Sequence, residues 1–364
     1  MSTLAATWLA AALAPPRAHG EPVCSARLRA VPEDFQVDEV LGFAPAGRGS
    51  HWLLQVRKRG ANTEWVAREL AKRAGVRSHD VGFAGLKDRH AVTTQWFTVP
   101  RPHADATQWQ GVQGEGYEVM AAHEHDRKLR RGALSGNRFD ILLTALLDSV
   151  DRAAIEARLA VLADVGVPNY FGPQRFGREC GNLLRAARYS AAPVAEQRPG
   201  PDRSERSFAL SAARSLIFNT ALAQRVQARS WNQLQVGDLA NFDDGQTIFA
   251  VSDVDEVLRL RCESGELHPT GPLWGAASLA PQGDIAASEA RAAAQCAPLD
   301  SWLLAEGLRA ERRALRLRVH DLQHEWAATG TNLRLCFRLN AGSFATTVLR
   351  ELISVADGDL GREA

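Results

Sequence analysis

Apolar and polar residues alternate in several short stretches of this chain, as they do in strands that bury one face. Residues 31–40 show this alternation, and 51–58 follow a glycine-rich turn, so residues 27–58 are predicted to form strands. Further strands are expected at 137–145 and 332–339. The last of these places four apolar side chains on one face: Leu333, Leu335, Phe337 and Leu339. These segments predict a sheet-rich unit with helices packed on one side.

Helical periodicity appears in other stretches. One helix should begin near Thr63, where Asn62 or Thr63 offers a capping side chain, and end at Gly75. Its buried stripe is expected to consist of Trp65, Val66, Leu70 and Ala71. The other helices are expected at 152–165, 208–229 and 344–353.

The middle of the chain differs in composition from both flanks. It carries the helical stretches, a Gly/Pro-bearing element at 166–177 and a polar Pro/Gly loop at 196–206, and strands are expected to resume only after about Arg318. A chain of 364 residues also exceeds a typical single domain. We therefore predict a first domain made of residues 1–162 and 319–364, interrupted by an inserted domain at 163–318.

The charge balance limits how a polyanion can be bound. Lys plus Arg number 43 and Asp plus Glu number 42, so overall charge cannot attract one, and local basic patches must hold it. The 45% apolar content is ordinary for a globular protein.

Five cysteines lie far apart, without CxxC spacing and with an odd total: Cys24, Cys180, Cys262, Cys296 and Cys336. This pattern predicts neither a zinc site nor a disulfide framework, and it fits a reducing cytoplasm. The first fourteen residues, MSTLAATWLAAALA, contain an apolar run. No lysine or arginine precedes that run, and it is too short to span a bilayer. We expect an ordered N-terminal strand or loop rather than a signal peptide.

The stretch GFAGLKDRHAVTTQ, residues 82–95, places one carboxylate, Asp88, on a glycine-primed turn between two apolar strands. Its side chain is expected to be exposed, fixed and reactive. The neighbours Lys87 and Arg89 would provide a positive setting that keeps it ionised. By composition alone, the alternative is a charged hairpin tip without chemistry.

Six segments in this chain resemble, in order, the motifs of the TruD family of tRNA pseudouridine synthases. They are VPEDFQV, AGLKDRHAVTTQ, KLRRGALSGNRF, NYFGPQRFG, SFALSAARSLIFN and AGSFATTVLRELI, spread from about residue 25 to about residue 355. The resemblance implies an α+β fold: a pseudouridine-synthase-type catalytic domain with a mixed, largely antiparallel sheet, interrupted by an inserted α/β TRUD domain. It also implies that Asp88 is the essential catalytic residue.

The resemblance implies a cytoplasmic enzyme that isomerises a uridine of tRNA, at position 13, to pseudouridine. That reaction needs no metal and no redox cofactor, so none is expected. A membrane partner is not expected either. The insertion suggests a two-lobed monomer with RNA in the cleft.

A uridine in folded RNA must be swung out to reach a carboxylate, and aromatic walls and polar contacts then hold it. The matches to family motifs favour Phe35, Phe139 and Phe344 as walls of the pocket and Asn137 as an amide that contacts the base or backbone. Taken singly, each phenylalanine is explained as well by burial in a core, and Asn137 by a turn. Arg29, where the family carries a basic residue, is the expected partner of the Asp88 carboxylate, with a solvated arginine as the alternative.

Two basic clusters are candidates for phosphate contacts. The first precedes the SGNRF motif and contains Arg127, Lys128, Arg130 and Arg131. The second would occupy one face of a helix and contains Arg309, Arg312, Arg313 and Arg316. Lys87 is a further candidate. A solvated surface explains such runs equally well, and the first cluster is favoured because it adjoins the expected pocket.

Three questions stay open from the sequence. In NYFGPQRFG, the residues Tyr170, Phe171, Arg175 and Phe176 fit a packed loop at the domain junction better than an RNA clamp. An RNA-binding module without catalysis is a second function to consider. A glycoside hydrolase is a third, and it would need Glu33 or Asp34 as a second carboxylate beside Asp88.

Overall fold

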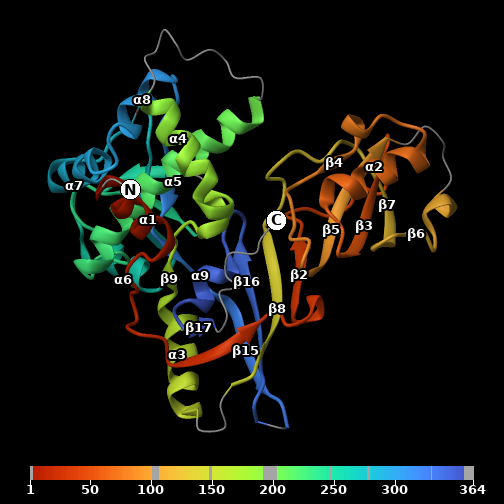
Figure 1. Cartoon of the computed structure of the whole chain (residues 1–364), viewed down its shortest axis with the longest axis horizontal. Helices are drawn as coiled ribbons and strands as arrows, with labels where there is room; N and C mark the ends of the chain where they lie inside the picture. The colour runs from red at the N-terminus through yellow and green to blue at the C-terminus, as the bar shows by residue number, and fades with distance from the viewer. Residues whose placement is uncertain are drawn as a thin grey trace.

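The computed structural model describes residues 3–100, 106–146, 150–191, 203–243, 245, 247–276, 279–328 and 330–355. Its helices and strands form two lobes joined by long central strands (Figure 1). One lobe carries most of a large sheet, and the other is built from helices around a smaller sheet. The fold class is therefore α+β, as expected, and the large sheet is mixed.

The large sheet is mixed and mostly antiparallel. Its strand order is β15-β16-β8-β2-β5-β3-β7-β6, with β1, β17 and β4 attached beside this path. Only the pairs β2–β5 and β1–β17 run parallel among the described strands. The strands are β1 (Cys24–Leu28), β2 (Phe35–Val40), β3 (His51–Arg59), β4 (Gly82–Phe83), β5 (Val92–Pro100), β6 (Gln113–Gly114), β7 (Tyr117–His125), β8 (Gly136–Thr144), β15 (His320–Trp326), β16 (Leu333–Asn340) and β17 (Ile353–Val355).

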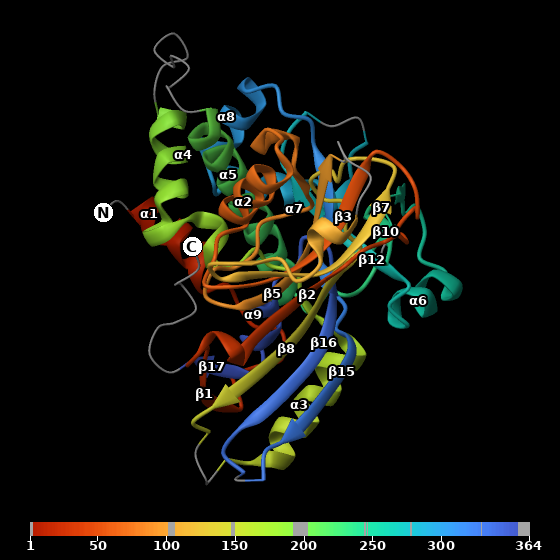
Figure 2. The same ribbon diagram turned by 90° about the vertical axis from the view of Figure 1, so that its right-hand side faces the viewer.

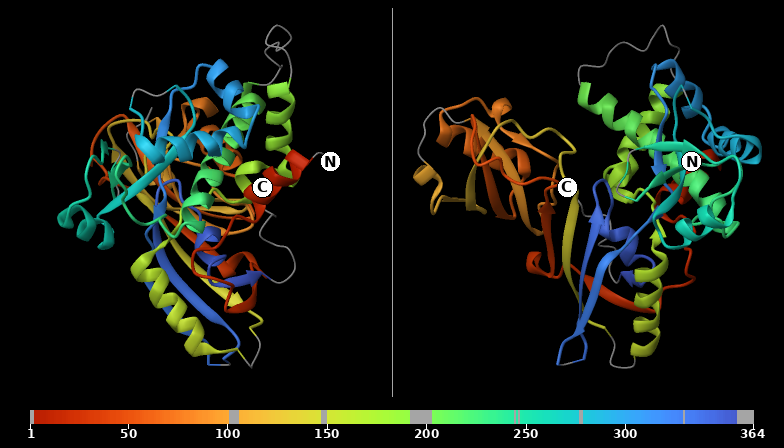
Figure 3. Two further views of the ribbon diagram at one scale, coloured as in Figure 1. Left: turned by 90° about the vertical axis from the view of Figure 1, so that its left-hand side faces the viewer. Right: turned by 180° about the vertical axis from the view of Figure 1, so that it is seen from behind.

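Alternation along these strands produces the predicted buried face. In β16 the residues Leu333, Leu335, Phe337 and Leu339 are all buried, as the sequence predicts. Helix α3 (Arg152–Val165) covers this face and contributes Ile155, Leu159 and Leu162 to the same core. Figures 2 and 3 show α3 lying along β15 and β16.

Helix α2 (Thr63–Ala74) covers the other end of the sheet, with the boundaries that the sequence predicts. Gly75 ends it in the left-handed conformation at φ 67°. Asn62 is the N-cap residue but makes no side-chain cap bond. Val66, Leu70 and Ala71 are buried as expected, whereas Trp65 is only partly buried.

The second lobe corrects one expectation. Strands also occur before Arg318. A four-stranded antiparallel sheet in the order β11-β10-β12-β13 lies within the inserted part. A short pair, β14–β9, joins this part to the first lobe. Most of these strands are too short to show alternation, and the seven-residue β12 shows none because all but its last residue are buried. They are β9 (Val167–Pro168), β10 (Leu239–Phe242), β11 (Ile248–Ala250), β12 (Leu267–Leu273), β13 (Glu311–Ala314) and β14 (Arg316–Leu317).

Helices enclose this smaller sheet. The long helix α5 includes the expected helix over 208–229 and begins earlier. The helices are α4 (Gly181–Ala191), α5 (Arg203–Gln227), α6 (Glu256–Glu263), α7 (Gly283–Ala294) and α8 (Leu299–Ala305). Side chains of α4, α5, α7 and α8 share one core, which is separate from the core under α3, whereas α6 packs in a smaller cluster with β10 and β12.

The expectation of an N-terminal strand or loop is wrong. Residues Thr3–Leu13 form helix α1, which packs against α5 (Figure 1). Alanine is the strongest helix former, and Trp8 and Ala12 bury themselves in the core of the inserted lobe. Among the described residues, no helix is both long and apolar enough to cross a membrane.

The C-terminal helix is shorter than expected. Helix α9 spans Ala345–Leu349, and the chain then forms β17, which pairs in parallel with β1 through Cys24 and Ile353. The sequence could not show this pairing, because the two strands lie at opposite ends of the chain. The division into domains at 1–162 with 319–364 and at 163–318 stays a proposal, and α1 packs on the inserted side of it.

Candidate active site

Asp88 lies in the loop between β4 and β5, and its side chain is only 10% exposed. The expectation of an exposed turn is therefore wrong. The loop folds back onto the sheet because Gly82 lets backbones approach closely: a Cβ there would lie 2.5 Å from Thr98 Oγ1 and 2.6 Å from the carbonyl oxygen of Leu129. Asp88 nevertheless lines a cleft, so its carboxylate is sheltered rather than sealed.

Side chains from neighbouring strands and a helix fix this loop through its backbone. Lys58 on β3 donates to the carbonyl oxygens of Asp88, at 2.7 Å, and Lys87, at 3.2 Å. Thr63 Oγ1, in the first turn of α2, accepts from the amide of Lys87 at 3.1 Å. The Gln95 amide group donates to the Gly85 carbonyl oxygen at 2.7 Å. The carboxylate is thus carried on a rigid support, which a catalytic group requires.

Lys58 is a functional residue that sequence reasoning missed. It is 1% exposed, and burial lowers the pKa of its ammonium from 10.5 to about 8, although the charge of Asp88 opposes this shift. It stands in a strand of alternating pattern, at a position indistinguishable from a surface lysine. Only the fold reveals that its side chain points under the Asp88 loop.

Arg29 and Asp88 form the expected ion pair. Arg29 Nη2 lies 3.2 Å from Asp88 Oδ2, and Arg29 is 6% exposed. The other carboxylate oxygen accepts from the amide of His90 at 2.8 Å. Arg29 directly follows β1 in the left-handed conformation at φ 60°, and its guanidinium lies 4.0 Å from the ring centre of Phe35. The pair therefore orients the carboxylate against one wall of the cleft.

The residues that flank Asp88 in sequence do not supply its positive setting. The ammonium of Lys87 is 2.7 Å from Glu39 Oε1, and both side chains are buried. Arg89 donates to the carbonyl oxygen of Gly60 at 3.0 Å. The expected electrostatics are thus provided by Arg29 and Lys58, which are distant in sequence. Lys87 also loses its basis as a phosphate contact, because Glu39 holds its charge.

The cleft beside Asp88 has a volume of about 580 Å³ and is lined from both lobes. All four expected pocket residues line it: Phe35, Asn137, Phe139 and Phe344. The Phe35 and Phe139 rings meet edge to face, 6.2 Å apart, and both residues are at least 94% buried. Each is therefore a core residue whose edge reaches the cleft, so it fits both the core and the pocket interpretations.

Asn137 and Phe344 line the cleft from two different elements, β8 and the start of α9. Asn137 lies within β8 rather than in the turn considered from sequence, and its Oδ1 is buried without a hydrogen-bond partner among the described residues. Phe344 is the N-cap residue of α9, where the sequence predicts a helix start. Its ring lies 6.5 Å from Phe171, which belongs to the inserted lobe.

The inserted lobe supplies the facing wall, of which the sequence analysis considered only Arg175, as part of an RNA clamp that it did not favour. Gln174 and Arg175 line the cleft, and neither Oε1 nor Nε2 of Gln174 has a hydrogen-bond partner among the described residues. Phe208 on α5 also lines it and is 53% exposed. The NYFGPQRFG motif was the available signal. Its aromatic residues Tyr170, Phe171 and Phe176 are buried, as the packed-loop interpretation predicts.

The first basic cluster is exposed, whereas three of the four arginines of the second are not. Lys128, Arg130 and Arg131 border a cavity of about 790 Å³, and Arg131 stacks its guanidinium 3.9 Å from the ring centre of Phe83. The helix expected for the second cluster is wrong, because Arg312 and Arg313 lie in β13 and Arg316 in β14. Their side chains are buried or half-buried in the inserted lobe and do not form one exposed face.

No second carboxylate accompanies Asp88 among the described residues that line the cleft. Glu33 pairs with Arg59 at 2.5 Å, and Asp34 accepts from the amide of Val31 at 3.1 Å. Both acids are therefore engaged in local structure. The glycoside hydrolase interpretation loses the partner that it requires. In the part of the chain that the structure describes, no group of three or more His, Cys, Asp or Glu side chains is placed to hold a metal ion.

Comparisons with known proteins identify the family of the chain. Residues 17–186 and 202–352 match the family described as tRNA pseudouridine synthase D (TruD). The tRNA pseudouridine synthase D of Methylococcus capsulatus is 48% identical over 338 residues, which cover 93% of this chain and 94% of that protein. The one of Xanthomonas campestris is 44% identical over 351 residues, with 94% and 95% covered.

A solved structure shares the fold. The crystal structure of a putative tRNA pseudouridine synthase D from Methanosarcina mazei superposes with a TM-score of 0.71 at 22% identity, covering 93% of this chain and 95% of that one. Fold and sequence together define an enzyme of the pseudouridine synthase class. The chain belongs to the TruD family, as its motifs predict.

Proposed function

We propose that this enzyme converts one uridine of tRNA to pseudouridine and that Asp88 is its essential carboxylate. The observation that carries the proposal is the position of Asp88: paired with Arg29 and lining a cleft with aromatic walls. It is the one carboxylate among the described residues of that lining. The names of the relatives support tRNA as the substrate.

The reaction rearranges atoms without changing composition. The bond between ribose C1′ and uracil N1 breaks, the base rotates, and a bond between C1′ and C5 forms while C5 loses a proton and N1 gains one. Asp88 can serve by bonding to C6, by bonding to C1′ or by removing the 2′ proton, and each path needs an ionised carboxylate next to the nucleotide. Arg29 pairs with that carboxylate and fixes its direction.

The cleft retains the detached base until it rejoins. The edges of Phe35 and Phe139 and the ring of Phe344 provide apolar walls, and Asn137 Oδ1 provides an acceptor without a partner in the described structure. Such a site suits a nucleotide that has been swung out of its stack. An enclosed pocket also keeps water from the cleaved sugar.

The target within tRNA is inferred from family resemblance alone, as the uridine at position 13 in the D-arm region. We also infer a monomer that works in the cytoplasm. Two observations support this: both walls of the cleft come from one chain, and all five cysteines are free.

The decisive experiment incubates the purified protein with unmodified tRNA and maps pseudouridine at nucleotide resolution. Wild type should modify a single uridine, at position 13, and Asp88→Asn should modify none while still binding tRNA. Glu33→Gln, which alters an exposed acid outside the cleft, is the matched control and should retain full activity. Conversion by the asparagine variant at the native rate would refute the role of Asp88.

The same assay separates the second function considered from sequence. An RNA-binding module without catalysis would bind tRNA and leave every uridine unchanged in wild type and variants alike. The intact pairing of Asp88 with Arg29 argues against that outcome, because a buried ion pair is costly to keep when it serves no purpose.

A further inference from the structure

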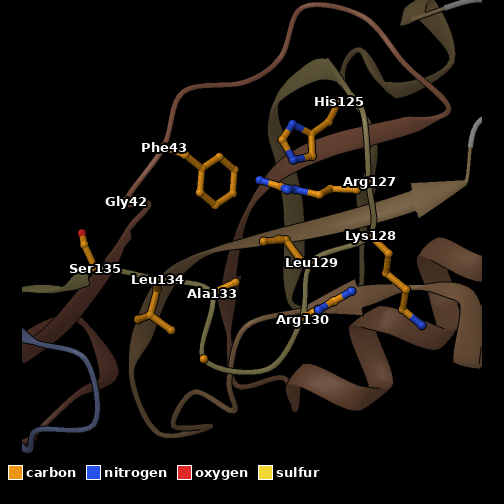
Figure 4. A pocket seen from close by; sticks show the side chains of 11 residues that line it. Gly42, Phe43, His125, Arg127, Lys128, Leu129, Arg130, Ala133, Leu134 and Ser135 are labelled. Atoms are coloured by element: carbon orange, nitrogen blue, oxygen red, sulfur yellow. The ribbon is translucent and has the colours of Figure 1, made fainter. Parts of the chain in front are cut away.

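A second cavity, of about 420 Å³, lies beside the basic segment 127–131 and shares no lining residue with the Asp88 cleft. Figure 4 shows it between the chain at Gly42 and Phe43 and the stretch from His125 to Ser135. Its volume is in the range that small organic ligands occupy. The cavity thus has the size of a site, and its chemistry indicates the ligand.

One wall is a fixed aromatic pair. The rings of Phe43 and His125 stack 5.3 Å apart at an angle of 20°. His125 is 2% exposed, and its Nδ1 accepts from the amide of Ala46 at 3.3 Å. Phe43 is only half-buried and points into the cavity, while Leu129 and Leu134 complete an apolar lining. A planar apolar group is the natural occupant of such a wall.

Cations surround this apolar lining. Arg127 is 75% exposed and extends toward Phe43 in Figure 4, and its contact with Asp126 is a loose one of 3.8 Å. Lys128 and Arg130 extend away from Phe43, toward the larger cavity that they border with Arg131. Residues 126–131 therefore offer four cations against one carboxylate. A ligand that combines a planar apolar part with phosphate matches both features.

Backbone hydrogen bonds connect the stretch that follows the basic segment 127–131 to strands and loops of the active site. The amide of Gly132 donates to the carbonyl oxygen of Ala84, which precedes the Asp88 loop, at 2.7 Å. The amide of Ser135 donates to the carbonyl oxygen of Val40 at 2.9 Å. Asn137, two residues further on, lines the cleft. One RNA molecule can therefore reach both sites across adjoining backbone.

We propose that this cavity binds a second, unpaired nucleotide of the same tRNA whose uridine enters the Asp88 cleft. Its base stacks on Phe43, and its phosphate lies against Arg127. The inference rests on the proposed function, because it takes tRNA as the substrate. A free phosphate or an acidic peptide would use the cations but leave the aromatic wall without a role, so a nucleotide accounts for more of the site.

Steady-state kinetics on full-length tRNA test the site. Loss of one base stack weakens binding by about 1–3 kcal/mol, so Phe43→Ala should raise KM roughly tenfold and leave kcat unchanged, while Phe43→Tyr keeps the wild-type KM. Phe242→Ala is the matched control: an aromatic 36% exposed, with the Arg261 guanidinium 5.5 Å from its ring centre, in the inserted lobe. A KM for Phe43→Ala within twofold of the control would overturn the proposal.

Crosslinking gives a readout that does not need turnover. With Phe43→p-benzoylphenylalanine in the Asp88→Asn background, irradiation should attach one nucleotide of tRNA other than the target uridine. Scattered adducts, no adduct, or an adduct to the target uridine itself would each contradict the site. A single adduct formed with an enzyme whose wild type modifies no tRNA would leave this site standing and refute the proposed function instead.

Discussion

Two arginine-rich segments of this chain, 127–131 and 309–316, have similar composition but differ in the burial of their side chains. In 127–131 the charged side chains are exposed and border two cavities, and only Leu129 is buried. In 309–316, by contrast, Arg312, Arg313 and Arg316 turn into the inserted lobe. The same residue type therefore serves as a surface charge in one place and as a structural crosslink in the other.

The backbone decides which role each segment takes. Residues 127–131 form no regular element. They are anchored by the buried Leu129, whose backbone amide donates a hydrogen bond to Thr98 Oγ1 at 2.8 Å. Residues 311–314 form β13, paired along β12 and facing helix α7. Arginine supplies up to five donors, so a buried one can satisfy several carbonyl and carboxylate oxygens at once. The number of charges in a sequence segment does not show whether its side chains point into the protein or into solvent.

The largest effect is expected from Arg312→Ala. Arg312 forms a two-pronged pair with Glu289, at 2.7 and 2.6 Å, and also donates to Thr270. Both side chains of the pair are about 10% exposed, so truncation leaves a buried carboxylate unpaired. We expect a loss of about 3–5 kcal/mol in the free energy of unfolding, measured by urea denaturation.

A double variant sharpens that comparison. Arg312→Met with Glu289→Met removes both charges, so it should recover most of the lost stability. Arg130→Ala is the exposed counterpart and should change the free energy of unfolding by less than about 0.5 kcal/mol. Equal losses for Arg312→Ala and Arg130→Ala would show that the two segments do not differ as described.

Arg29→Ala should produce the next largest effect, on turnover rather than on stability. This buried arginine faces the cleft, where its partner is the carboxylate of Asp88. Loss of the charge that orients a reacting group typically costs on the order of 100-fold in rate, so kcat should fall by about that factor while tRNA affinity persists. Arg29→Lys should restore part of the rate. Unchanged single-turnover kinetics in Arg29→Ala would remove Arg29 from the reaction.

Sequence alone recovered the parts of the fold that repeat a long pattern. The boundaries of α2 and the buried face of β16 follow from periodicity over eight or more residues. Helix α1 was missed because alanine-rich apolar runs suit several structures, and its packing partner α5 lies two hundred residues away. Apart from the seven-residue β12, the strands of the inserted lobe have only two to four residues and are set by tertiary pairing, not by local pattern.

The site divides in the same way. Asp88, Phe35, Asn137, Phe139 and Phe344 line one cleft as predicted, because motif resemblance preserves their common position. Lys58 escaped prediction, since its role depends on how β3 lies under the Asp88 loop. Gln174 escaped as well, because only the assembled cleft shows that its amide has no described partner. Contacts between segments that are distant in sequence depend on the fold and cannot be inferred from local sequence.

Lys58 predicts a pH dependence of stability. Its folded pKa of about 8 is below the unfolded value of about 10.4, so between these values the unfolded chain binds the extra proton and stability rises with pH. Relative to Lys58→Met, which cannot titrate, wild type should gain about 1–2 kcal/mol between pH 7.5 and pH 9.5 in urea denaturation. Parallel pH curves for the two proteins would show that Lys58 does not titrate in this window.

The smallest effect, in affinity alone, is expected from Arg130→Ala with Arg131→Ala. Each phosphate contact contributes about 0.7–0.9 to the slope of log affinity against log salt, so removing two cations should flatten the slope by about 1–2. Folding should be unaffected, since both side chains are exposed, although Arg131 also stacks on Phe83. The control is Arg229→Ala with Arg291→Ala, two exposed arginines of the inserted lobe. A slope equal to that of wild type would make 127–131 an ordinary solvated surface, and the contrast with 309–316 would then concern structure alone.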